Sequence, residues 1–237
     1  MRPSLDALSR NSRAISYSLR GDFRSGFRVD RELGFDGHLQ QLDTIFERAG
    51  LERAVLCGVS YGGLIALRYA ATRPGRVSGL VLVSAPAPGW QPSKRQARYI
   101  SRPWLSAPLF VAMGPLRLWP EIRAALPRWR TRARFAVAHA LRVLGAPSIP
   151  GLMALRVRQQ EGIDFLVDCQ RVHAPALIIT GEEHLDKVVP AHVTERYAEL
   201  LPSVQHIRME RTGHIGMVTQ PQNFAELVGR FAHAHHR

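Results

Sequence analysis

One serine lies where its neighbours could turn it into a nucleophile. Ser60 follows a short apolar run at 54–57, precedes a second apolar segment at 64–67, and has glycine at positions 58 and 62. A reactive serine on a sharp turn between a strand and a helix needs neighbours with almost no side chain, because the turn is tight and strained. The order of strand, glycine-flanked serine and helix predicts a nucleophile elbow at Ser60. The alternative is a glycine-rich turn that carries an ordinary exposed serine.

A serine hydroxyl needs a base to take its proton, and His214 is the best-placed histidine. Histidine suits this role because its usual pKa lies near neutrality. His214 directly follows the last expected strand, and the glycines at 213 and 216 let the chain turn sharply there. Other histidines are placed less well: His206 lies within a strand, His184 and His192 flank the candidate acid loop, and His233, His235 and His236 are expected in a disordered tail.

The base in turn needs a carboxylate to fix its tautomer and stabilise its charged form. Three acids follow the strand that ends near residue 180, namely Glu182, Glu183 and Asp186. We choose Asp186, because it lies four residues before the proline that opens the next helix and is therefore well inside the loop. Glu182 and Glu183, directly after Gly181, are the alternatives.

The elements that must position these residues alternate between strands and helices along the chain. This pattern predicts an α/β fold with a mostly parallel sheet flanked by helices. Strands are expected at 13–19, 54–57, 77–83, 174–180 and 204–209, and helices at 39–49, 61–72 and 222–232. The last helix should bury Phe224, Leu227, Val228 and Phe231.

A long stretch without strand patterns interrupts this alternation. Prolines divide residues 88–170 into short segments, expected to be helices such as 131–144. A structureless loop of that length is improbable in a compact domain, so we predict an inserted helical cap at 88–170 between core segments at 1–87 and 171–237. All four tryptophans, at 90, 104, 119 and 129, fall in the insertion. We expect them mainly to pack the cap onto the sheet, or else to wall a hydrophobic pocket.

The chain of 237 residues is strongly basic, with a net charge of +13. Of its 32 basic residues only Lys94 and Lys187 are lysine, and no nucleic-acid motif accompanies them, so no nucleic-acid partner is expected. Much of the charge lies between residues 88 and 170. A solvated basic face is the favoured interpretation, and an attraction for acidic substrates or lipid headgroups is the alternative.

Composition also bears on where the protein works and on what it binds. No apolar run is long enough to span a membrane and no secretory signal is present, so we expect a cytoplasmic protein without stable membrane insertion. Cys57 and Cys169 lack metal-ligand spacing, and neither a metal nor a cofactor is expected. Cys57 should be a small buried residue of its strand. The oligomeric state stays open.

The chain order Ser60, Asp186, His214 resembles that of the α/β-hydrolase superfamily over about residues 5–232. The segment Ser18-Leu19-Arg20-Gly21-Asp22-Phe23-Arg24-Ser25 is similar to the family's Asp-Leu-Arg-Gly-His-Gly-x-Ser loop, and the elbow, acid loop and Thr-Gly-His loop also match. The resemblance implies a serine hydrolase that cleaves a small carboxylic ester, thioester or lactone through an acyl-enzyme. Tyr61 would give its backbone N–H to the oxyanion. Serine at the nucleophile position points away from the family members that use aspartate. The alternatives are a carbon–carbon bond hydrolase and a non-catalytic binding protein of the same fold.

One departure concerns the start of the chain. Family members begin with further strands and a His-Gly loop that lends a second backbone N–H to the oxyanion, whereas this sequence contains no His-Gly dipeptide. Loss of one such donor costs about 10²–10³ in rate. We therefore expect a longer reading frame upstream of Met1, with a trimmed, weakened hydrolase as the alternative. Missing strands would leave an exposed sheet edge.

Overall fold

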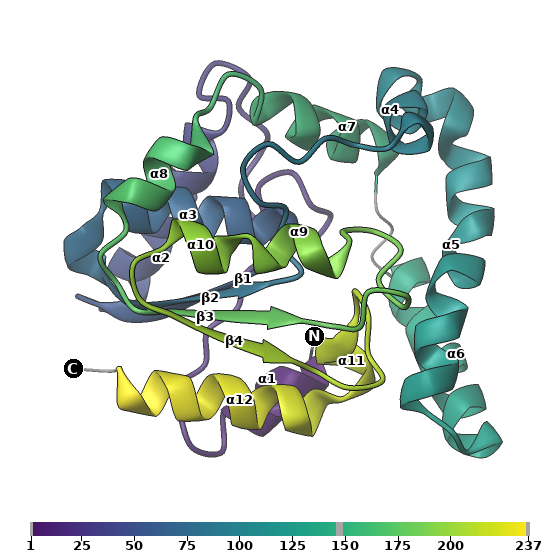
Figure 1. Ribbon diagram of the computed structural model, residues 1–237. Coiled ribbons are helices and arrows are strands. Elements are labelled where there is room, and N and C mark those ends of the chain that lie inside the picture. Colours follow the sequence, from purple (N-terminus) through teal and green to yellow (C-terminus); the bar gives the residue numbers. More distant parts are fainter. Residues whose placement is uncertain (1, 146–148, 236–237) are drawn as a thin grey trace. The chain divides into compact units, whose positions relative to one another are not determined.

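The computed structural model describes residues 2–145 and 149–235. The chain forms two compact units (Figure 1). The first contains Met1–Ser16, Phe46–Trp90 and Asp164–Arg237, and the second contains Tyr17–Ile45 and Gln91–Ile163. The division into a core and a cap at 88–170 stays a prediction. Residues 146–148 and His236 lie outside the described residues.

A parallel four-stranded sheet forms the centre of the first unit. Its strands are β1 (Ala54–Val59), β2 (Val77–Val83), β3 (Ala176–Thr180) and β4 (Val204–Arg208), in the order β1-β2-β3-β4. The two central strands are buried along their whole length, as expected for strands covered on both faces. In the part of the chain that is described, β1 and β4 are the edges and are partly exposed. The predicted α/β fold with a parallel sheet is confirmed.

Helices cover both faces of this sheet (Figure 1). On one face, α3 (Tyr61–Thr72) packs on β1 and β2, together with α8 (Phe165–Arg171), α9 (Ala191–Glu195) and α10 (Tyr197–Leu200). On the other face lie α1 (Arg2–Leu8), α11 (Gly216–Thr219) and α12 (Pro221–Ala234), and the short helix η1 (Pro74–Arg76) leads into β2. α12 buries the four predicted apolar side chains against residues of β2 and β3. The prediction that this helix buries one apolar face is therefore confirmed.

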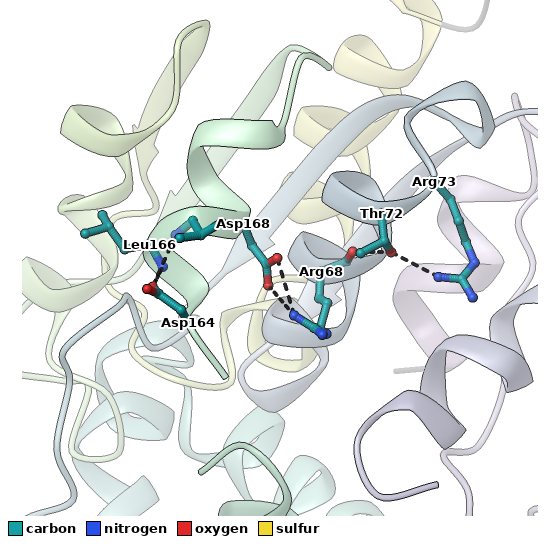
Figure 2. A network of polar contacts seen from close by, with 7 residues as sticks. Arg68, Thr72, Arg73, Asp164, Leu166 and Asp168 are labelled. Atoms are coloured by element: carbon teal, nitrogen blue, oxygen red, sulfur yellow. Dashed lines mark hydrogen bonds and ion pairs between the residues drawn. The ribbon is translucent and has the colours of Figure 1, made fainter. Parts of the chain in front are cut away.

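A buried ion pair joins α3 to α8 (Figure 2). Arg68 Nη1 lies 3.2 Å and 3.4 Å from the two carboxylate oxygens of Asp168, whose side chain is buried. Asp164 caps α8, since its Oδ1 accepts hydrogen bonds from the N–H groups of Leu166 and Val167. Burial raises the pKa of Asp168, and the Arg68 guanidinium opposes that shift. The pair therefore satisfies a carboxylate that would otherwise be buried alone.

The second unit is mainly helical. It contains α4 (Lys94–Ser101), α5 (Pro103–Ala125), α6 (Trp129–Gly145), α7 (Pro150–Gln159) and most of α2 (Asp36–Ala49). Arg156 of α7 holds the loop that follows Leu19, because its Nη2 donates to Asp22 Oδ1 at 2.8 Å and to the Arg20 carbonyl at 3.2 Å. Gly21 in this loop has a positive φ of 84°, which few other residues adopt.

The strand expected at 13–19 is absent, and the segment has no regular secondary structure among the described residues. At its end, one backbone carbonyl bonds to a side chain. The Gln41 amide donates to the Ser18 carbonyl at 2.9 Å and accepts from the Arg20 N–H at 2.9 Å. The buried Gln41 side chain thus satisfies backbone groups at the end of this segment.

The prolines do not cut the second unit into short pieces. α5 runs for 23 residues with Pro108, Pro115 and Pro120 inside it. A proline removes one helical N–H and pushes away the carbonyl four residues earlier. All three prolines lie on exposed positions, where water can satisfy that carbonyl. The helix expected at 131–144 is present within α6.

Smaller expectations also failed. Cys57 is exposed, because β1 is an edge strand. The tail is ordered further than expected, since His233 belongs to α12 and the His235 ring contacts the Phe231 ring at 4.6 Å. Trp104, Trp119 and Trp129 are exposed on the helices of the second unit. Over the described residues, we find no helix with the length and apolar character to cross a membrane.

Candidate active site

Ser60 occupies the sharp turn between β1 and α3. Its backbone has φ 52° and ψ −123°, a left-handed conformation that is unusual for a residue with a side chain. Two hydrogen bonds hold the turn: Ser60 N–H donates to the Val83 carbonyl, and Gly63 N–H donates to the Ser60 carbonyl, both at 2.8 Å. Among the described residues, the Ser60 hydroxyl caps no N–H of α3. This is the geometry that a nucleophile elbow requires.

The glycines around Ser60 have unequal roles. A Cβ on Gly58 would lie 2.3 Å from the Gly62 carbonyl oxygen, so the expectation for Gly58 is confirmed. The expectation for Gly62 is wrong, because a Cβ there would meet no atom of the described chain within 4 Å. Gly63 has the second close approach instead, since its Cβ would lie 2.4 Å from Ala85 Cβ. In the sequence, the only hint of the close approach at Gly63 is that two glycines stand together at 62–63.

The structure brings Asp186 and His214 together. His214 Nδ1 lies 3.1 Å from Asp186 Oδ2, in a pair whose carboxylate is almost fully buried. The other oxygen, Oδ1, accepts hydrogen bonds from the N–H groups of Val188 and Val189 at 2.9 Å and 3.0 Å. An Nδ1–H that donates to this fixed carboxylate leaves His214 Nε2 free to accept a proton.

The two alternative acids bond elsewhere. Glu182 Oε1 accepts from the Arg211 N–H at 2.6 Å, close to the turn that leads to the histidine. The Glu183 carboxylate lies 3.0 Å from the N–H of His192 and 2.8 Å from its ring Nδ1. Of the three acids that follow β3, Asp186 is thus the one that contacts the His214 ring in the described part of the chain.

Two glycines fix the separation of the acid loop and the histidine loop. A Cβ on Gly213 would lie 2.5 Å from the Leu185 carbonyl oxygen and 2.9 Å from Asp186 N. A Cβ on Gly181 would lie 2.5 Å from the Thr212 carbonyl oxygen. The backbones of the loops after β3 and β4 therefore cross in contact at these glycines, which sets the imidazole beside the carboxylate.

The loop after β2 is held by residues that sequence reasoning missed. Thr194 Oγ1 donates to the Ala85 carbonyl at 2.9 Å, and the buried Tyr197 hydroxyl donates to the Pro86 carbonyl at 2.7 Å. Ala85 is also the residue against which Gly63 packs. α9 and α10 thereby support the elbow from behind. Nothing in the sequence distinguishes this threonine and tyrosine from ordinary core residues.

Tyr61 is the first residue of α3. The N–H groups in the first turn of a helix lie at the positive end of the helix dipole. The position next to Ser60 therefore suits a group that meets negative charge on a bound molecule.

The sequence from residue 2 to residue 227 matches the alpha/beta hydrolase family. The chain belongs to this family. Two relatives are named carbamate hydrolase RutD. The protein from Pseudomonas savastanoi pv. phaseolicola is 26% identical, over 97% of this chain and 87% of its own length. The protein from Klebsiella pneumoniae is 28% identical, over 94% of this chain and 82% of its own length.

Solved structures of α/β hydrolases share the fold. An esterase from Thermogutta terrifontis has a TM-score of 0.74 at 20% identity, covering 100% of this chain and 85% of the esterase. The enol-lactonase from Burkholderia xenovorans has a TM-score of 0.71 at 20% identity, covering 97% of this chain and 84% of the lactonase. A meta-cleavage product hydrolase from Pseudomonas fluorescens has a TM-score of 0.65 at 22% identity, covering 97% of this chain and 83% of that hydrolase. The chain is thus a hydrolase of the α/β type.

Proposed function

We propose that the protein is a serine hydrolase in which Ser60, His214 and Asp186 act as a catalytic triad. The observation that carries the proposal is the Nδ1–Oδ2 contact of 3.1 Å between His214 and the buried Asp186. The strained elbow at Ser60 supplies the third member, at the carboxyl end of the same parallel sheet. Ligands of open α/β sheets bind at that end.

In the proposed reaction, Ser60 Oγ attacks the substrate carbonyl while His214 Nε2 takes the hydroxyl proton. The Tyr61 N–H donates to the oxygen that becomes negative. Collapse of the tetrahedral intermediate breaks the bond to the leaving group, which receives the proton from His214. Water then repeats the sequence on the acyl-enzyme and releases the acid. Asp186 stabilises the imidazolium in both steps and holds its ring in place.

The substrate class that we propose is a small molecule with an activated carbonyl: a carboxylic ester, a thioester or a lactone. The relatives named carbamate hydrolase add carbamates to this class, because a carbamate carbonyl is attacked in the same way. A carbon–carbon bond hydrolase is the second candidate, supported by the structural likeness to the meta-cleavage product hydrolase. A panel of esters, lactones, carbamates and vinylogous diketones compared by kcat/KM separates the two.

A fluorophosphonate probe tests the nucleophile directly. We expect the folded protein to be labelled, and Ser60→Ala to lose the label while it keeps the wild-type circular dichroism spectrum. Labelling that survives in Ser60→Ala, or absence of labelling in the folded wild type, would contradict the proposal.

The acid can be assigned with a matched pair of substitutions. Asp186→Asn should lower kcat by about 10³–10⁴ with little change in KM, because the amide favours the wrong tautomer of the histidine. Glu183→Gln is the control, since Glu183 pairs with His192 instead, and it should keep wild-type kcat. Equal losses in both variants would remove Asp186 from its proposed role.

A further inference from the structure

The helices α4 to α7 of the second unit present basic side chains with almost no acid among them. Residues 91–160 contain 13 Lys and Arg, and Glu121 is the one carboxylate. Glu121 is fully buried, at 0% exposure, so it adds no negative charge to the surface. The basic residues include Arg123, Arg128, Arg130 and Arg134, which are all exposed. The surface of this part of the chain is therefore positively charged.

Large apolar side chains also lie exposed on α5 and α6. On α5, Leu105, Leu109 and Leu116 are 76%, 57% and 65% exposed, and their spacing places them on one side of the helix. On α6, Val137 and Leu141 are 61% and 65% exposed. Trp104 and Trp129 near the starts of the two helices are 71% and 67% exposed. So many large apolar side chains exposed on two neighbouring elements of the chain favour an interaction surface.

The same side of α6 carries both kinds of side chain. Arg130 and Arg134 are separated from Val137 and Leu141 by three, seven or eleven positions, so all four lie along one helical face. A shallow apolar depression on α6 is lined by Ala133, Arg134, Val137, Ala138 and Leu141. The aliphatic and cationic groups are thus adjacent on one surface.

The turn between α5 and α6 forms a second depression of about 520 Å³. Trp119, Arg123, Pro127 and Arg132 line it, and the Arg132 guanidinium lies 5.8 Å from the centre of the Trp119 ring. Two guanidinium groups beside an indole suit a phosphate ester, because arginine binds phosphate oxygens through paired N–H donors.

We propose that the exposed side chains of α5 and α6, here called the hairpin surface, bind the surface of a membrane that contains anionic phospholipids. Leucine and valine side chains enter the boundary between headgroups and acyl chains, and tryptophan is favoured at that depth. The arginines pair with headgroup phosphates at the same level. The surface lies on the membrane and does not span it.

Other partners fit these side chains less well. Single-stranded nucleic acid would engage the arginines and tryptophans but gains nothing from exposed leucine and valine. A second copy of the chain would bring an identical basic surface against this one, and like charges oppose that contact. Only a partner that is both anionic and apolar satisfies both kinds of side chain.

Sedimentation of the full chain with lipid vesicles tests the proposal. We expect binding to vesicles of phosphatidylglycerol and phosphatidylcholine, weaker binding at high salt, and little binding to phosphatidylcholine alone. Tryptophan emission should shift to shorter wavelength on binding, because Trp104 and Trp129 leave water. Equal binding to both vesicle types, no binding to either, or tighter binding to a single-stranded oligonucleotide would overturn it.

Matched variants separate the hairpin surface from general charge. Arg128→Gln, Arg130→Gln and Arg134→Gln together should weaken binding to anionic vesicles about 100-fold. The control removes the same charge from exposed arginines of the first unit, through Arg2→Gln, Arg10→Gln and Arg230→Gln, and should change binding several-fold at most. Equal losses in the two triple variants would show that net charge alone is responsible, which contradicts the proposal.

Two further variants complete the test. Leu105→Ser with Leu109→Ser should weaken binding while the unfolding temperature stays unchanged, because both side chains are exposed. If these substitutions instead dissolve a dimer seen by analytical ultracentrifugation, a second copy occupies the surface and the proposal is wrong. Ser60→Ala should bind vesicles like the wild type, so failure of the proposed catalytic function would leave this result untouched.

Discussion

At the scale of single residues, the candidate site depends on where the strands of the sheet end. Ser60, Asp186 and His214 each follow a strand of a parallel sheet, and parallel strands bring their carboxyl ends to one edge. Chain order alone could not choose between Asp186 and its two glutamate neighbours. That choice depends on the crossing of two loop backbones at Gly181 and Gly213, a contact between segments distant in sequence.

The elbow glycines give a sharp prediction at this scale. Gly58→Ala should destabilise the fold by about 1–3 kcal/mol, because its Cβ would strike the Gly62 carbonyl. Gly62→Ala should be neutral or stabilising by up to about 1 kcal/mol, since the site is open and alanine favours a helix. Urea unfolding of the two variants measures the difference. A larger loss in Gly62→Ala than in Gly58→Ala would contradict the assignment.

At the scale of elements, prediction succeeded where burial follows a simple period. β1 to β3, α3 and α12 match their expected positions to within a few residues, because each has one strongly apolar face or is apolar throughout. β4 also lies where expected, although its residues are half-buried or exposed. Prediction failed where a single side chain or contact with water determines the local backbone conformation. The Gln41 side chain bonds to the backbone at Ser18 and Arg20, where a strand was expected to end, and water-exposed positions let three prolines stay inside α5.

The contact of α3 with α8 leads to a prediction about a buried charge. Arg68→Met should destabilise the protein by about 3–5 kcal/mol, because it leaves the buried Asp168 without its cation. Adding Asp168→Leu should recover most of that loss, since the apolar pair needs no solvation. A double-mutant cycle from urea unfolding gives the coupling. A double variant no more stable than Arg68→Met would show that packing, and not charge, holds α8.

At the scale of the whole molecule, the pH dependence of stability should carry the signature of one histidine. His38 is 3% exposed, and burial lowers its pKa from 6.5 to about 4, with the nearby Arg156 and Arg20 charges acting in the same direction. The folded state therefore excludes a proton that the unfolded state binds. Stability is unaffected above the unfolded pKa and falls as the pH drops from there towards the folded value, by about 3 kcal/mol in all.

His38→Gln isolates this contribution. The variant lacks the titrating group, so the difference in unfolding free energy between variant and wild type should change steadily below the unfolded pKa and stay constant above it. Chemical denaturation across a pH series measures that difference. A constant difference over the whole series would show that His38 titrates alike in both states.

The backbone of Ser60 has an energetic consequence for the protein as a whole. A residue with a side chain held at φ 52° sits in a conformation that costs about 1–3 kcal/mol, and glycine would relieve part of it. Ser60→Gly should therefore unfold at a higher urea concentration than Ser60→Ala, although neither has a hydroxyl; identical midpoints would show that the turn stores no strain. The fold thus bears a free-energy cost at Ser60, which a selective advantage of that hydroxyl would maintain.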